Sequence, residues 1–154
     1  MLQLESVPVA EWKSIGKHRV VIEGDVVYVQ WRGELELDEV QSVFGLYGSV
    51  FAEHGRAFAL VDLRQSGVPP EPVRRWIGEW QRSHGELSGA AAFGAGWVMR
   101  SLFLLVGRAM ALIGRRQLPS AAFATEAEAR EWINAMRQRL PHPSPREHGR
   151  EAAP

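Results

Sequence analysis

Cysteine is absent from this chain of 154 residues, and so is an excess of charge of either sign. Without cysteine there can be no disulfide, no thiolate nucleophile and no cysteine-ligated metal, and a cytoplasmic location is expected. The 18 basic residues balance 18 acidic ones, which removes the electrostatic basis for nucleic-acid binding. The N-terminus has no basic region followed by an apolar core, so no signal peptide is expected.

Long apolar runs are also scarce. The most apolar stretch is 97–114, WVMRSLFLLVGRAMALIG, and it contains Arg100 and Arg108. A membrane span needs about 20 predominantly apolar residues, and a central arginine opposes insertion. We therefore expect a helix of the core and no integral membrane protein. A helix lying on a membrane surface stays open as the alternative.

Catalytic motifs are missing as well. The five histidines show neither H-x-x-x-H nor H-E-x-x-H spacing, and no G-x-S-x-G elbow surrounds Ser66. The turn at 94–96, GAG, lacks both the third glycine of a dinucleotide fingerprint and the Lys-Ser/Thr of a Walker motif. Anion binding there, assisted by Arg100, is a weak alternative. We expect no catalytic residue, no metal site and no cofactor, and hence a protein that is not an enzyme.

What the chain does contain is a buried central strand at Phe58–Leu63, within AFALVDLRQSG. Apolar residues without polar alternation indicate a strand that is covered on both sheet faces. Asp62 is the exception, and we expect it to bond to the next turn. The turn itself, 64–67, lies where an α/β sheet presents its functional groups.

Helices and strands alternate around this strand. The patterns predict a hairpin at 18–32 turning at Gly24 and Asp25, further strands at 89–93 and 121–124, and helices at 37–54, 72–84, 97–114 and 126–140. Thr125 and Glu128 form a capping box. The order is β-β-α-β-α-β-α-β-α, which predicts an α/β domain with a mixed, mostly parallel sheet. We expect an N-terminal extension at 1–16, the domain at 17–140 and a disordered tail at 141–154.

Three segments carry a resemblance to a known family. They are FALVDLR, GAAAFGAGW and AAFATEAEAREWI, and with the order of elements they resemble the STAS domain, in its SpoIIAA-like (STAS/SEC14-like) branch, over 18–140. The resemblance implies a bacterial, non-enzymatic regulatory or scaffolding module that binds a partner protein, such as an anti-sigma factor or a kinase-like protein. The family's Asp-Ser or Asp-Thr phosphoacceptor pair is replaced here by VPPEPV.

The expected partner surface is the turn after the central strand and the start of the next helix. Its residues are Arg64, Gln65, Ser66, Gly67, Glu71 and Arg74. Ser66 is the one hydroxyl near the family's phosphoacceptor position and is a candidate phosphosite. The other interpretation is a turn serine that caps local backbone groups.

A second hypothesis is a binder of a small apolar or lipid-like ligand, at a site on the apolar helix. Its residues would be Trp97, Arg100, Phe103 and Met110. Trp76 and Trp80, one helical turn apart, are predicted to lie in the core rather than on a binding surface. The sequence leaves open whether the protein forms a homodimer.

Overall fold

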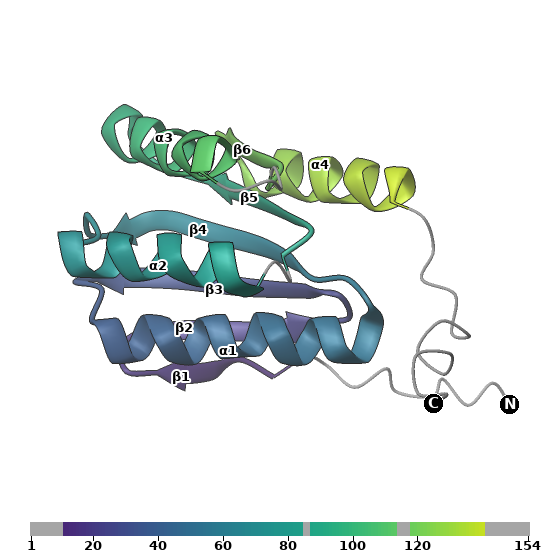
Figure 1. The fold of residues 1–154 in the computed structure, drawn as a ribbon, viewed down its shortest axis with the longest axis horizontal. Helices are drawn as coiled ribbons and strands as arrows, with labels where there is room; N and C mark the ends of the chain where they lie inside the picture. Colours follow the sequence, from purple (N-terminus) through teal and green to yellow (C-terminus); the bar gives the residue numbers. More distant parts are fainter. Residues whose placement is uncertain (1–10, 85–86, 114–117, 141–154) are drawn as a thin grey trace, which may run out of the picture.

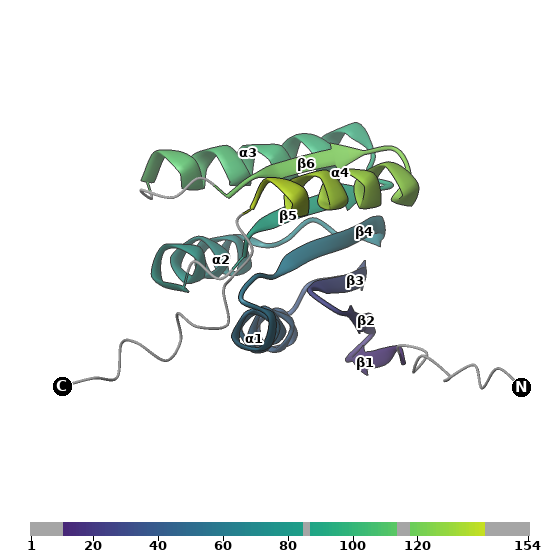
Figure 2. The ribbon, with the colours of Figure 1, turned by 90° about the vertical axis from the view of Figure 1, so that its right-hand side faces the viewer.

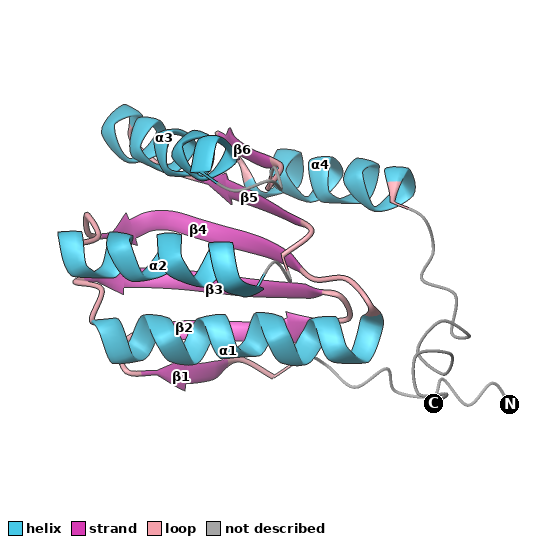
Figure 3. Ribbon diagram, in the orientation of Figure 1, coloured by secondary structure: helices cyan, strands magenta, loops and turns pink. Residues whose placement is uncertain are grey.

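The fold is organised around one mixed sheet, drawn in Figures 1 and 3. The computed structural model describes residues 11–84, 87–113 and 118–140. The sheet has six strands in the order of the chain, β1(Lys13–Ile15), β2(His18–Glu23), β3(Val26–Gly33), β4(Phe58–Ser66), β5(Gly89–Phe93) and β6(Ser120–Phe123). The helices are α1(Leu37–His54), α2(Glu71–His84), α3(Trp97–Ile113) and α4(Glu126–Arg139).

The strand pairing changes once from antiparallel to parallel, at β3. β1, β2 and β3 pair antiparallel, whereas β3, β4, β5 and β6 pair parallel. Gly24 turns the β2–β3 hairpin at a φ of 60°, which glycine adopts without steric cost. The predicted mixed α/β sheet is confirmed, with one strand more than the sequence indicated. That strand, β1, lies in the stretch expected to precede the domain.

β4 is the centre of the sheet, as predicted, and lies between β3 and β5. Its residues from Phe58 to Leu63 are all buried. The strand is longer than the sequence indicated, because Gln65 and Ser66 still pair with the end of β3. Residues 64–66 therefore belong to the strand, and the chain turns only at Gly67, whose backbone N–H donates to the carbonyl of Gly33 at 2.8 Å.

Three helices cover one face of this sheet. α1 and α2 cross in front of it in Figure 1 and lie together on one side of it in Figure 2. α3 packs on the same face through Met99 and Phe103. Trp80 is buried in this core and Trp76 is half-buried against Phe44, in agreement with the prediction that both belong to the core.

α4 covers the other face by itself. Ala129 and Ile133 are buried there against Phe58 and Leu60 of β4. The helix begins as predicted, because the Thr125 hydroxyl accepts from the backbone N–H of Glu128 at 3.3 Å. Within the described ranges, no helix has both the length and the hydropathy that crossing a membrane requires. The expected tail at 141–154 lies outside those ranges.

Candidate functional site

The six residues of the expected partner surface lie together at the carboxyl end of β4 and the start of α2. Arg64, Gln65 and Glu71 are exposed, whereas Ser66, Gly67 and Arg74 are half-buried. This is the edge of a parallel sheet at which α/β proteins bind their ligands. The structure therefore brings the residues together, with both charge signs and polar groups accessible to solvent.

Arg64 is held rigidly although its side chain is 60% exposed. Its Nε and Nη2 donate to Oδ1 and Oδ2 of Asp62 at 3.0 and 2.8 Å. The guanidinium also lies 5.5 Å from the centre of the Phe93 ring. A Cβ on Gly94 would come within 2.3 Å of Arg64 Cγ, so only glycine leaves room for this orientation. The buried Asp62 thus orients an exposed arginine.

These contacts also show that Asp62 is not a general base for Ser66. Both carboxylate oxygens of Asp62 accept from Arg64, and the Ser66 hydroxyl donates to the carbonyl of Gly67 at 2.9 Å. A nucleophilic serine instead needs a general base within hydrogen-bond reach of its hydroxyl. Ser66, the last residue of β4, bonds to local backbone through its hydroxyl.

Gly67 and Arg74 fix the turn between β4 and α2. A Cβ on Gly67 would lie 2.7 Å from the carbonyl oxygen of Gly33, so this position holds two backbone segments together and offers no side chain to a partner. Arg74 Nη1 donates to the carbonyl of Pro69 at 2.7 Å. Glu71 pairs with Arg75 one turn further along α2.

Behind this surface lies a cavity of about 140 Å³. It lies between the sheet and α1, α2 and α3, and it is partly open to solvent. Its apolar lining includes Trp31, Leu35, Phe44, Tyr47, Val61, Leu63, Ile77, Met99, Leu102, Phe103 and Leu118, and its polar lining is Ser66, Arg74, Gln81 and Ser120. Two residues of the partner surface, Ser66 and Arg74, thus also line the cavity.

The cavity adjoins α3, where the second hypothesis placed a ligand, but its lining differs from the residues named for it. Phe103 lines the cavity. Trp97 is 78% exposed, and Arg100 is exposed and donates to the carbonyl of Ala122 at 3.1 Å; neither lines the cavity. The side chain of Met110 lies outside those described. Hydrophobicity identified the helix, whereas its rotation about its own axis decides which residues face inward.

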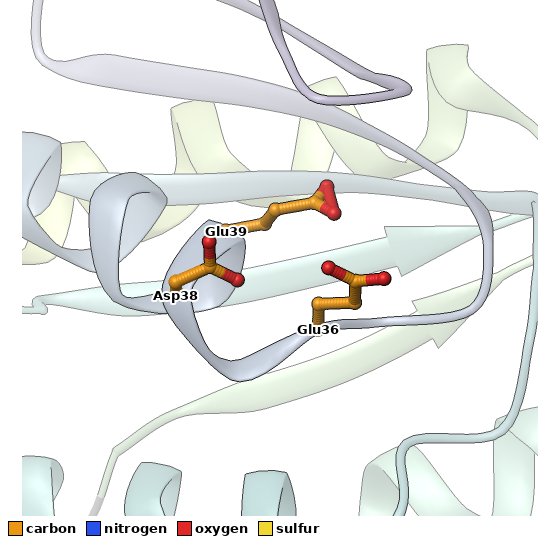
Figure 4. A group of neighbouring side chains, drawn as sticks. All are labelled: Glu36, Asp38 and Glu39. Atoms are coloured by element: carbon orange, nitrogen blue, oxygen red, sulfur yellow. The ribbon is translucent and has the colours of Figure 1, made fainter.

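A second group of ionisable side chains lies at the start of α1. The carboxylates of Glu36, Asp38 and Glu39 approach within 4.8 Å of one another (Figure 4). Acidic residues at this place are stabilised by the helix dipole without any bound ion. Glu39 is also only 3.1 Å from His18, measured from Oε2 to Nε2.

The Nε2 atom of His18 faces this group, but neither it nor Oε2 of Glu39 has a hydrogen-bond partner among the described residues. His18 is 1% exposed, and its Nδ1 accepts from the backbone N–H of Arg32 at 2.9 Å. The proton of the neutral ring therefore belongs on Nε2, which faces Glu39 and has no lone pair for a metal. Burial lowers the pKa of His18, against the opposing effect of Glu39. No pattern in the sequence indicated this contact.

Comparison with known proteins bears on the fold alone. No protein-family model matches the chain, and no curated protein sequence does. An uncharacterised Shewanella loihica protein of the DUF3478 family, with a SpoIIAA-like fold, matches over 74% of this chain and 89% of its own at 16% identity and a TM-score of 0.55. The unphosphorylated anti-sigma factor antagonist SpoIIAA matches over 81% of this chain and 97% of its own at 12% identity and a TM-score of 0.50. Together with the observed sheet and helices, these two likenesses show that this protein has the SpoIIAA-like fold that its sequence resembles.

Proposed function

We propose that this protein is a non-enzymatic regulatory module, located in the cytoplasm, that binds a partner protein through the end of β4 and the start of α2. The observation that carries the proposal is Arg64, which is exposed yet fixed by Asp62 and Phe93. An arginine that is already ordered loses little freedom on binding, and arginine is enriched among the residues that dominate interface energies.

The fold likeness supports the same surface. One structural neighbour is an anti-sigma factor antagonist, and the protein partner of this chain would be of a comparable kind, an anti-sigma factor or a kinase-like protein. Ser66 lies in this surface, so phosphorylation would add negative charge beside the N-terminus of α2, where the helix dipole favours it. Regulation of partner binding at Ser66 is therefore part of the proposal.

Site-specific photocrosslinking in the native host tests the proposal. A photoreactive amino acid at Gln65 should give a crosslink to one discrete protein, and the same substitution at Gln138, an exposed position on α4, should not. With purified partner, Arg64→Ala should weaken binding roughly tenfold or more, because truncated hot-spot residues cost at least about 2 kcal/mol. Crosslinks at Gln138 alone, or an Arg64→Ala affinity equal to that of the wild type, would contradict the assignment.

A second function is favoured by the cavity. A partly open, mainly apolar space with a few polar groups in its lining is the usual form of a small-molecule site. Its volume of about 140 Å³ is too small for a long acyl chain, since an apolar cavity of about 150 Å³ in another protein is filled by benzene. The second candidate is therefore the binding of a small apolar molecule rather than of a membrane lipid.

A further inference from the structure

The described lining of the cavity is mainly apolar and includes one charged side chain. Arg74 is the ionic member of the lining, and no carboxylate pairs with it in the part of the chain that the structure describes. Its Nη1 is used by the carbonyl of Pro69, which leaves Nε and Nη2 without a protein acceptor among the same residues. A guanidinium with two free donors binds a planar carboxylate in bidentate fashion.

The position of Arg74 strengthens this preference. It lies in the first turn of α2, which begins at Glu71, so the positive end of the helix dipole adds to the charge of the guanidinium. Ser66, at the end of β4, also lines the cavity, and its hydroxyl can hydrogen-bond the polar group of a ligand. Gln81 lines the cavity two turns further along α2, about 10 Å from Arg74, which is too far for it to contact the same carboxylate.

Tyr47 also lines the cavity and is 2% exposed. Burial raises the pKa of its hydroxyl, so the group stays protonated and can donate a hydrogen bond to an acceptor atom on a bound molecule.

The size of the cavity limits the apolar part of the ligand. At about 140 Å³ it accommodates a single six-membered ring or a short branched chain. Aromatic and aliphatic side chains form most of the described lining, including Phe44, Leu102 and Phe103. One ring-sized apolar body and one anionic group are what this lining complements.

We propose that the cavity binds a small apolar carboxylate, such as an aromatic or short aliphatic acid, with its carboxylate on Arg74. This inference rests on the second proposed function, that the cavity takes a ligand at all, and adds the chemical class. Because Arg74 and Ser66 also belong to the partner surface, occupancy of the cavity would alter the same turn that we propose to bind the partner.

Benzoate and toluene are the matched probes, since both present one ring and only benzoate carries a charge. Titration of the full chain, followed by ¹⁵N–¹H NMR, should show that benzoate binds more tightly than toluene, with shifts at residues around the cavity. Arg74→Gln should weaken benzoate binding on the order of ten- to a hundredfold, as expected for a charge-assisted bond, and leave toluene binding within about twofold. Arg75→Gln, on the same helix but exposed and paired with Glu71, is the control and should bind like the wild type.

A cavity-filling variant separates the outcomes. Ile77→Phe, which adds volume to a residue of the lining, should abolish binding of both probes while the chain stays folded. Equal binding of toluene and benzoate, unaffected by Arg74→Gln, would overturn the carboxylate assignment and leave the apolar-ligand function standing. If neither probe binds the wild type, both the carboxylate assignment and the apolar-ligand function are overturned. Neither result touches the partner-binding proposal, which crosslinking tests separately.

Discussion

At the scale of single residues, the side chain of His18 links the β2–β3 hairpin to α1. We expect the contribution of this contact to stability to depend on pH. In the neutral ring, Nδ1 accepts a hydrogen bond from the backbone N–H of Arg32. Protonation would put a proton on Nδ1, so that two donors would face each other. The charged groups around it are Glu39 and Glu36, which favour the charged ring, and Lys17, which opposes it together with burial. Burial prevails, so the pKa of His18 is lowered in the folded state.

The predicted consequence is a loss of stability in mild acid. Because the pKa of His18 in the folded state lies below its ordinary value of 6.5, the contribution of neutral His18 to stability is complete above pH 6.5 and is lost as pH falls through the folded-state pKa. Between the two values the slope is at most about 1.4 kcal/mol per pH unit. This slope is measured as the free energy of unfolding in urea, for the wild type and for His18→Asn, from about pH 7.5 to about pH 5.

In His18→Asn the side-chain oxygen can still accept from Arg32 N–H, but the position no longer titrates. This variant should therefore show a shallower dependence on pH than the wild type. His54→Asn, at the exposed end of α1, serves as the control and should keep the slope of the wild type. The same slope in His18→Asn as in the wild type would show that another group is responsible.

Asp25 shows why long-range ionic contacts could not be predicted. The sequence identified Gly24-Asp25 correctly as a hairpin turn, and nothing in it marked Asp25 as buried. The carboxylate pairs with Arg56 at 2.7 Å and with Arg137, 112 positions away, at 2.6 Å. Burial opposes ionisation of Asp25, but the bonds and charges of Arg137 and Arg56 prevail and lower its pKa. Only the fold brings these three residues together.

At the scale of elements, β5 depends on small side chains. It reads GAAAF and all five residues are buried. Ala91 is fully buried on the face that α4 covers, and it is paired in the sheet with Leu60 and Ala121. A larger residue there would separate helix from sheet, because buried residues are packed without spare space.

Ala91→Leu should therefore destabilise the fold by about 1–3 kcal/mol, the usual cost of overpacking a core. Ala52→Leu makes the same chemical change at an exposed position of α1 and should change stability by less than about 0.5 kcal/mol. Urea unfolding of both variants measures the difference. Equal effects would mean that Ala91 is not tightly packed against α4.

Elements with a strong local signal were the predictable ones. The α1 face, the Thr125 cap and the buried run of β4 each follow from spacing along the chain, and all three are present. β1 gave no such signal, because three residues, KSI, are too few to show alternation. The extension of β4 to Ser66 depends on pairing with β3. For the candidate site, the position of the turn after β4 could be predicted from the end of the buried run. The residues that line the cavity could not, because they depend on how three helices pack on the sheet.

At the scale of the whole molecule, one strand connects the two cores. Phe58 and Leu60 of β4 point into the core beneath α4, and the alternate residues Ala59, Val61 and Leu63 point into the core beneath α1, α2 and α3. Neither core is complete without β4. We therefore expect the domain to unfold in one cooperative transition, as single domains of this size usually do.

Two tryptophans report on the two cores separately. Trp80 is buried on the face of α1, α2 and α3, and Trp132 packs on the face of α4. In a urea titration followed by NMR, their indole signals should therefore be lost with the same midpoint, and far-UV circular dichroism should give that midpoint as well. Loss of the Trp132 signal at lower urea, while Trp80 stays native, would instead mean that α4 separates from a sheet that three helices still hold. In that case the face beneath α4, and not the turn after β4, would be the part of the molecule that opens most easily to a partner.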